Sequence, residues 1–148
     1  MPNNVYVDTS LLLAAFSNEP GQPIALALLQ EPQWTLVCVS DWTLAEFDCA
    51  LHAKVLRGET PTDVAHAINQ SIERLLEVGA LQRLPVLRED YSAVQRVVPG
   101  ISCLVRGADA LHLAVAARSG MTHFASLDKT QRLAAAQWLR DIPCVPEL

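Results

Sequence analysis

The sequence is poor in aromatic and in charged residues. Phe, Trp and Tyr make up 5% of its 148 residues, and Asp, Glu, Lys and Arg make up 18%. Hydrophobic residues make up 51%, which is enough for a core and argues against a disordered chain. That core must come mostly from Leu, Val, Ile and Ala. The length suits one domain of ordinary size, and we expect residues 1–148 to form a single domain.

The sequence lacks the patterns that are typical of zinc sites. None of the four histidines belongs to an H-x₃-H or H-E-x-x-H pattern, and no two of the four cysteines form a C-x-x-C pair. A chain with this much apolar material needs no disulfide to hold a core. We therefore expect reduced, buried thiols at Cys38, Cys49, Cys103 and Cys144.

A long apolar run is also missing. No uninterrupted stretch approaches the ~20 residues that a membrane span needs. The N-terminus has no basic segment followed by a long apolar core, so a signal peptide is not indicated. These features predict a cytoplasmic protein without a membrane-bound part.

The chain has no excess of positive charge. Its formal net charge is −5 and its sequence pI is about 5.2, whereas a protein that binds nucleic acid by charge alone should be basic. A phosphate-bearing ligand would therefore need local compensation. A bound divalent cation could supply it, and a local cluster of Arg and Lys could add to it.

Strand-like and helix-like segments alternate along the chain. Apolar, β-branched stretches predict strands over residues 4–8, 34–39, 81–86, 122–126 and 144–145. Apolar positions at helical spacing predict helices over 11–16, 24–29, 41–56, 61–78, 89–97, 107–119 and 129–139. Ser40 and Thr60 are the predicted N-caps of the third and fourth helices, and Pro99 and Gly100 mark a loop. This alternation predicts a three-layer α/β/α fold with a central, mostly parallel sheet of four to five strands.

Four acidic residues fall at the ends of these segments. Asp8 ends the first strand, and Asp128 follows the strand over 122–126. Asp109 opens a helix, and Glu46 lies in the first turns of the helix after the second strand. In open parallel sheets, ligands bind outside the carboxyl ends of the strands. We therefore expect these four side chains at one edge of the sheet.

Carboxylates gathered at one edge repel one another. A pair ~4 Å apart costs about 4 kcal/mol at an effective dielectric constant of ~20. A cation relieves this repulsion, and oxygen ligands of this kind suit Mg²⁺ or Mn²⁺. Such an ion can orient and polarise a phosphodiester and lower the pKa of a bound water.

Each acid also has a simpler role when it is taken singly. Asp8 and Asp128 could cap the helices that follow them, and Asp109 could complement a helix dipole. Glu46 could be a solvated helix residue. The occurrence of all four at one predicted edge is what favours the metal site.

The motifs around these acids resemble the PIN-domain family and, within it, the VapC-type toxins of bacterial toxin–antitoxin pairs. The motifs cover nearly the whole chain and are Val-Tyr-Val-Asp8-Thr-Ser10, Ser40 followed by Leu-Ala-Glu46, Arg106-Gly-Ala-Asp109-Ala-Leu-His-Leu-Ala, and Ser126-Leu-Asp128. The resemblance implies a PIN-like fold and an acidic quartet with catalytic and metal-binding roles: Asp8, Glu46, Asp109 and Asp128. It further implies a Mg²⁺- or Mn²⁺-dependent endoribonuclease that cuts RNA, is usually a homodimer and is inhibited by a cognate antitoxin.

Several nearby residues are candidates for supporting roles. Ser10 and Ser126 match positions where the family often has a hydroxyl near the metal; each could hold a carboxylate or simply cap a helix. His112 could relay protons, although a packed, hydrogen-bonded histidine is the simpler interpretation. The candidate contacts to RNA phosphates, each of which could also be a solvated surface charge, are Arg106, Lys129 and Arg132.

Other classes of function stay open at this point. A haloacid-dehalogenase-like phosphatase also has an acid after its first strand, but its chemistry needs a second Asp two residues on, where this chain has Ser10. A binding or regulatory module without catalysis is a further alternative. A receiver domain needs an acidic pair at the first strand end, where only Asp8 stands. A PIN scaffold that has lost catalysis should lack part of the quartet, which is complete here.

Overall fold

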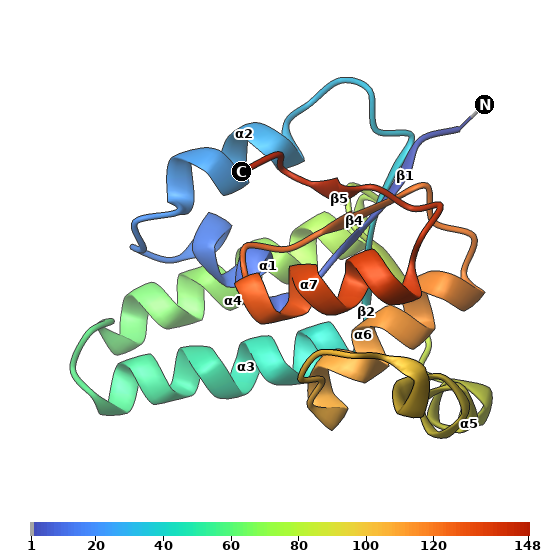
Figure 1. The fold of residues 1–148 in the computed structure, drawn as a ribbon. Coiled ribbons are helices and arrows are strands. Elements are labelled where there is room, and N and C mark those ends of the chain that lie inside the picture. Colours follow the sequence, from blue (N-terminus) through green and yellow to red (C-terminus); the bar gives the residue numbers. More distant parts are fainter. Residues whose placement is uncertain (1) are drawn as a thin grey trace.

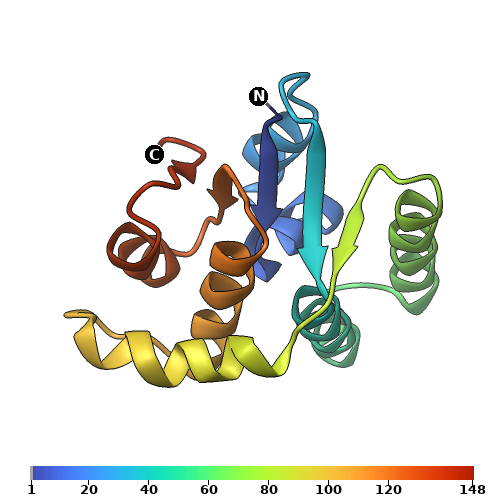
Figure 2. The ribbon, with the colours of Figure 1, turned by 90° about the vertical axis from the view of Figure 1, so that its right-hand side faces the viewer.

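The structure is a computed structural model that describes residues 2–148. Five parallel strands form one sheet in the order β3-β2-β1-β4-β5. The strands are β1 (Asn4–Val7), β2 (Leu36–Ser40), β3 (Gln82–Leu84), β4 (His123–Ala125) and β5 (Cys144–Val145). Helices lie on both sides of this sheet (Figures 1 and 2). The predicted three-layer α/β/α fold is confirmed.

The helices follow the strands in the predicted alternation. They are α1 (Thr9–Phe16), α2 (Gln22–Leu29), α3 (Asp41–Leu56), α4 (Thr62–Glu77), α5 (Arg88–Val97), α6 (Gly107–Arg118) and α7 (Lys129–Trp138). A 3₁₀ turn, η1 (Val98–Gly100), follows α5. No helix within residues 2–148 is both long and apolar enough to cross a membrane.

The sheet separates two hydrophobic cores, and β1 contributes to both. Val5 and Val7 are fully buried in the core that α1, α2, α3 and α4 cover. Tyr6, between them, is fully buried in the core that α6 and α7 cover. This alternation arises because successive side chains of a strand point to opposite faces of the sheet. A central strand of this kind must be apolar on both faces, as parallel strands usually are.

Three local predictions need correction. Thr60 does not cap α4; Pro61 occupies the cap position, without a side-chain hydrogen bond. Pro99 and Gly100 lie in the η1 turn rather than in an irregular loop. Cys49 is exposed, because it lies on the outer side of α3; only Cys38 of the four free cysteines is fully buried.

The carboxyl ends of the strands meet at one edge of the sheet. The arrows of β1 and β2 in Figure 2 point toward the same end of the molecule, where α1 and α3 begin. The start of α3 is fixed by a capping box, as predicted for Ser40. The Ser40 hydroxyl accepts from the N–H of Thr43 at 3.0 Å, and the Thr43 hydroxyl accepts from the N–H of Ser40 at 3.2 Å. This edge carries the candidate site.

Candidate functional site

Asp8 lies at the end of β1 and caps α1. Its Oδ1 accepts a hydrogen bond from the N–H of Leu11 at 3.1 Å and one from the hydroxyl of Ser10 at 2.7 Å. The residue is only 3% exposed. Burial raises the pKa of Asp8 above its ordinary value, although the nearby His112 and these hydrogen bonds oppose the shift. Burial therefore disfavours the ionised form of Asp8, and a bound cation would stabilise that form.

Glu46 is half-buried on α3 and is held by two donors. Its Oε1 accepts from the Thr9 hydroxyl at 2.7 Å and lies 2.5 Å from Nε2 of His112. Burial raises the pKa of Glu46, but the hydrogen bonds from His112 and Thr9 outweigh it, so that the pKa lies below its ordinary value. The alternative of a solvated helix residue is therefore wrong for Glu46.

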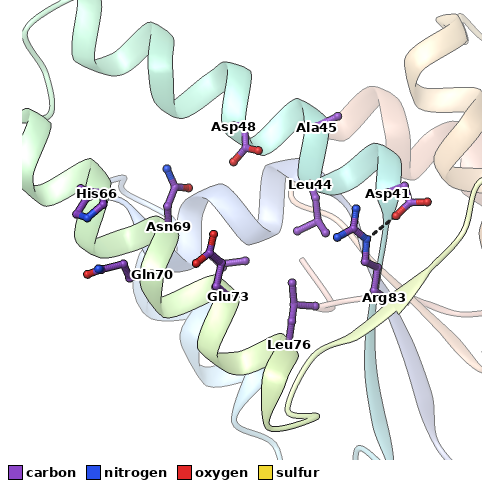
Figure 3. A pocket seen from close by; sticks show the side chains of 11 residues that line it. Asp41, Leu44, Ala45, Asp48, His66, Asn69, Gln70, Glu73, Leu76 and Arg83 are labelled. Carbon is purple, nitrogen blue, oxygen red and sulfur yellow. Dashed lines mark hydrogen bonds and ion pairs between the residues drawn. The ribbon is translucent and has the colours of Figure 1, made fainter.

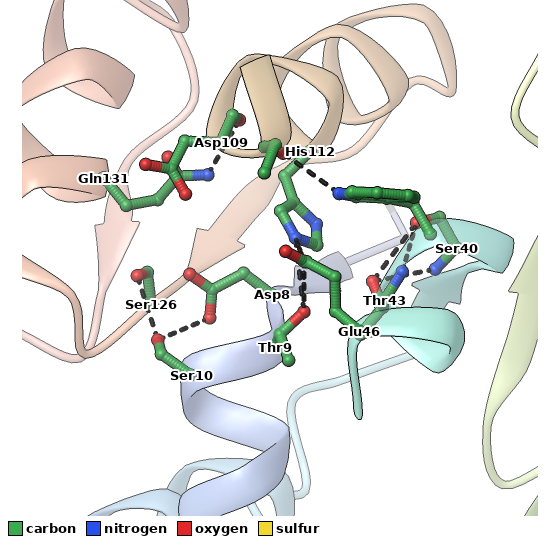
Figure 4. A network of polar contacts seen from close by, with 12 residues as sticks. Asp8, Thr9, Ser10, Ser40, Thr43, Glu46, Asp109, His112, Ser126 and Gln131 are labelled. Atoms are coloured by element: carbon green, nitrogen blue, oxygen red, sulfur yellow. Dashed lines mark hydrogen bonds and ion pairs between the residues drawn. The ribbon is translucent and has the colours of Figure 1, made fainter. Parts of the chain in front are cut away.

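Asp109 lies in the first turn of α6 and is half-buried. Burial raises the pKa of Asp109, and the charge of Asp128 raises it further, with smaller contributions from Glu46 and Asp8. Asp109 thus lies within electrostatic reach of three other carboxylates, which come from separate segments. Figure 4 shows the side chains of Asp8, Glu46 and Asp109 around a shared space.

Asp128 is exposed and caps α7. Its Oδ1 accepts from the N–H of Thr130 at 2.8 Å and from the N–H of Gln131 at 3.2 Å. Its own N–H donates to the Ser126 hydroxyl at 3.0 Å. Asp8 and Asp128 therefore both cap a helix. In each residue the capping hydrogen bonds go to one carboxylate oxygen, Oδ1.

The three basic candidates differ in their surroundings. Arg106 and Lys129 are exposed, next to the segments that carry Asp109 and Asp128. Arg132 instead donates to the carbonyl oxygens of Ser126 at 2.8 Å and Pro146 at 2.6 Å, which ties the end of β4 to the C-terminal segment. Its guanidinium thus already has a structural role.

Sequence reasoning missed several residues that surround the acids. Thr9 holds Glu46, and Tyr6 donates to or accepts from His112 Nδ1 at 2.7 Å. His112 itself is 2% exposed, which confirms the interpretation as a packed, hydrogen-bonded histidine. Tyr6 and Thr9 adjoin Asp8 in the chain, and that proximity was the one signal available for them.

Gln131 is a further residue that the sequence did not single out. It is 1% exposed, and its Nε2 donates to the backbone carbonyl of Asp109 at 3.1 Å. Its Oε1 is buried and has no hydrogen-bond partner within the described residues. A buried acceptor without a donor is costly, and this one adjoins Asp109.

One hollow of the surface lies away from the acids. This pocket of about 570 Å³ lies between α3 and α4 and is lined by Asp41, Leu44, Asp48, Glu73 and Arg83, among others (Figure 3). A smaller pocket of about 420 Å³ includes Ser10 and Asp128 in its lining. A hollow thus adjoins the acidic site on the side of Ser10 and Asp128.

The family model for the PIN domain matches residues 5–137. The chain belongs to the PIN domain family. Among curated protein sequences, none matches this PIN domain.

Solved structures of other proteins share the fold of this PIN domain at low sequence identity. VapC20 of Mycobacterium tuberculosis, a sarcin-ricin loop cleaving toxin, is 19% identical with a TM-score of 0.67; the match covers 89% of this chain and 94% of that one. FitAcB of Neisseria gonorrhoeae is 17% identical with a TM-score of 0.70, covering 96% of each chain. VapBC2 of Rickettsia felis, bound to a DNA fragment from its promoter, is 11% identical with a TM-score of 0.61, covering 96% and 97%.

The donor set of this PIN domain fits a hard divalent cation in its chemistry. The candidate ligands are all carboxylates, burial and the neighbouring acids raise the pKa of Asp109, and Gln131, whose Oε1 has no partner within the described residues, donates to the backbone carbonyl of Asp109. Within residues 2–148, however, no three His, Cys, Asp or Glu side chains are gathered closely enough to hold an ion as they stand. The fit is therefore one of donor type and charge, and the side chains would have to close around an ion.

Proposed function

We propose that this PIN domain is a Mg²⁺- or Mn²⁺-dependent endoribonuclease and the toxin of a toxin–antitoxin pair. The observation that carries the proposal is that Asp109 lies within electrostatic reach of Asp8, Glu46 and Asp128, while hydrogen bonds from Thr9 to Glu46 and between Ser10 and Ser126 join the segments that carry these acids. The match to the PIN family supports it. So does the shared fold with VapC20, a toxin that cleaves the sarcin-ricin loop.

The four carboxylates would hold the ion. When bound, the ion polarises the phosphodiester and lowers the pKa of the attacking water. Ser10 fixes the Asp8 carboxylate, and Thr9 and His112 fix that of Glu46.

The exposed Arg106 and Lys129, next to the segments that carry Asp109 and Asp128, would contact RNA phosphates. Such contacts matter here because the chain as a whole is acidic, with a net charge of −5. The position that a phosphatase would need for its second Asp is occupied by Ser10, which donates to Asp8 instead. This hydrogen bond favours a role of Ser10 in positioning the Asp8 carboxylate.

The proposal includes a cognate antitoxin, a homodimeric assembly and a cytoplasmic location, as in VapC-type toxins. The shared fold with VapBC2 and FitAcB supports the kind of partner. Growth arrest on expression of this chain, and its relief by co-expression of the antitoxin candidate encoded beside it, tests this part. Arrest that no partner relieves would contradict the toxin–antitoxin role.

Neutral, isosteric variants test the chemistry. We expect Asp8→Asn and Asp109→Asn each to abolish cleavage of RNA by the purified chain while the far-ultraviolet circular dichroism stays unchanged, because an amide weakens metal binding without changing shape. Asp63→Asn, at an exposed position on α4, is the matched control and should cut normally. EDTA should stop wild-type cleavage, and Mn²⁺ or Mg²⁺ should restore it.

Two outcomes would overturn this function. Near wild-type cleavage by Asp8→Asn would contradict the mechanism in which carboxylates hold a catalytic ion. Cleavage that persists in chelator would identify a ribonuclease that needs no metal.

A further inference from the structure

A chain of buried hydrogen bonds runs behind the acidic site and ends on Glu46. The hydroxyl of Tyr6 lies 2.7 Å from Nδ1 of His112, and Nε2 of the same ring lies 2.5 Å from Oε1 of Glu46. Tyr6 is fully buried and His112 is 2% exposed, whereas Glu46 reaches the surface of the site. Figure 4 shows the His112 end of this chain, where the ring lies beside the Glu46 carboxylate and Thr9.

The rings of this chain are locked by packing. Tyr6 stacks on Phe124 with centroids 5.5 Å apart and an interplanar angle of 4°. His112 meets Tyr6 edge-on at 5.7 Å. Polar groups are costly in such a core unless all of them are satisfied. A network that serves packing alone could be replaced by apolar side chains, whereas this one delivers a donor to a carboxylate of the site.

The hydroxyls of Ser40 and Thr43, at the end of the chain away from Glu46, indicate the direction of the hydrogen bonds. The Thr43 hydroxyl donates to the carbonyl oxygen of Val7 at 3.3 Å, so its proton is engaged. The Ser40 hydroxyl, 2.8 Å from the Tyr6 hydroxyl, can therefore donate to Tyr6.

The polar atoms around the Tyr6 hydroxyl are Nδ1 of His112 at 2.7 Å, Ser40 Oγ at 2.8 Å and Thr43 Oγ1 at 3.2 Å; Nδ1 is the nearest of them, and the Tyr6 proton is assigned to it. A neutral imidazole that accepts at Nδ1 carries its proton on Nε2. That proton points at Oε1 of Glu46, which also accepts from Thr9. Both recorded hydrogen bonds of the Glu46 carboxylate thus go to Oε1, and within residues 2–148 none goes to Oε2.

We propose that Tyr6 and His112 are positioning residues for Glu46: Tyr6 selects the Nε2–H tautomer of His112, and His112 anchors one carboxylate oxygen so that the other is presented to the cation. This role rests on the proposed function. Partners that orient a ligating side chain in this way typically affect metal affinity as well as catalysis. Neither residue touches the reacting atoms.

Two substitutions of His112 separate positioning from packing. A Gln side chain can place its amide N–H near the position of Nε2, whereas an Asn side chain reaches only the position of Nδ1. We expect His112→Asn to weaken binding of Mn²⁺ to the RNA-free full-length chain about 10- to 100-fold in calorimetry. His112→Gln should stay close to the wild-type affinity. Equal losses in the two variants would show that packing alone matters and would overturn the positioning role.

Tyr6→Phe tests the other end of the chain and removes a single hydroxyl. ¹⁵N spectra of the histidine side chains at neutral pH should show the Nε2–H tautomer of His112 in the wild type and a mixture of tautomers in Tyr6→Phe. This measurement needs neither metal nor RNA. An Nδ1–H tautomer or a doubly protonated ring in the wild type would contradict the role assigned to Tyr6. If His112→Asn fails to fold, the Mn²⁺ affinity of Tyr6→Phe, expected below that of the wild type, decides instead.

The same data distinguish the two levels of the proposal. If the wild type binds Mn²⁺ and cuts RNA while His112→Asn and Tyr6→Phe match it, the positioning role fails and the proposed function stands. If the wild type neither binds Mn²⁺ nor cuts RNA, the proposed function fails, and the assignment of Glu46 as a metal ligand fails with it.

Discussion

The hydroxyl oxygens of Ser10 and Ser126 lie 3.3 Å apart, although 116 residues separate the two in the chain. Ser10 also donates to Asp8 at 2.7 Å and accepts from the N–H of Leu127 at 3.1 Å. Ser126 accepts from the N–H of Asp128 at 3.0 Å. The pair thus joins the start of α1 to the loop after β4, and with them two of the four acids.

Removal of the Ser10 hydroxyl should therefore affect both stability and activity. Ser10→Ala takes a donor from Asp8 and leaves the N–H of Leu127 without its acceptor, which should destabilise the fold by about 1–3 kcal/mol. We expect thermal unfolding to shift down by roughly 3–10 °C, and RNA cleavage to fall about 10- to 100-fold. Ser71→Ala, at an exposed site on α4, is the control. Unchanged unfolding and cleavage in Ser10→Ala would show that the hydroxyl bridge is dispensable.

Local patterns were sufficient to predict most of the fold. The run Val-Tyr-Val before Asp8 is apolar on both faces, as a central parallel strand must be, and Ser40 stands at the start of a long helical pattern. The parallel arrangement then places the strand ends at one edge. The position of Asp8 and Asp128 at that edge therefore follows from the order of the segments.

The partners of these acids could not be predicted in the same way. Glu46 is held by Thr9 and His112, which lie 37 and 66 residues away, and no local pattern encodes which helix meets which. Asp90 shows the same limit. It accepts from the N–H of Leu87, three residues before it, but its carboxylate is 1% exposed and pairs with Arg118 of the neighbouring helix α6.

The pH dependence of stability should report the buried Asp8. Because its pKa is raised in the folded state, the fold loses stability as the pH rises from the ordinary Asp value of about 4 to the higher folded value, and the loss is complete above it. In EDTA, Asp8→Asn should therefore unfold at a higher temperature than the wild type at pH 8, and the difference should shrink toward pH 4. A difference that grows on acidification would show that the folded-state pKa of Asp8 is lowered instead.

Cation binding should be visible in the stability of the fold. At a Mn²⁺ concentration of about 100 times the dissociation constant, binding adds about 2.7 kcal/mol, and unfolding should shift up by roughly 5–10 °C. Asp109→Asn should lose most of this shift. In EDTA, Asp109→Asn should be at least as stable as the wild type, because the charges of Asp128, Glu46 and Asp8 no longer oppose an ionised group at position 109. Asp63→Asn is again the control, and an equal Mn²⁺ shift in Asp109→Asn would contradict this role.

The ion pair between Asp90 and Arg118 should support the fold without taking part in the chemistry. Nε and Nη2 of Arg118 lie 2.7 Å and 3.1 Å from the two oxygens of Asp90, and Nη2 also donates to the carbonyl of Pro85 at 2.8 Å. Arg118 ends α6, whereas Asp109 lies in its first turn. The pair therefore fixes the helix at the end far from the site.

Arg118→Met keeps the length of the side chain but leaves a buried carboxylate without its partner. We expect a loss of about 2–3 kcal/mol, below the range for fully buried pairs, because the Arg118 side chain is 28% exposed. Chemical denaturation should show this loss, while cleavage well below the unfolding temperature stays normal; Arg74→Met, on the exposed side of α4, is the control. The double variant Asp90→Asn/Arg118→Met should recover part of the stability, since the unpaired charge is then gone. A double variant as unstable as the sum of the two single ones would show that the two residues act independently.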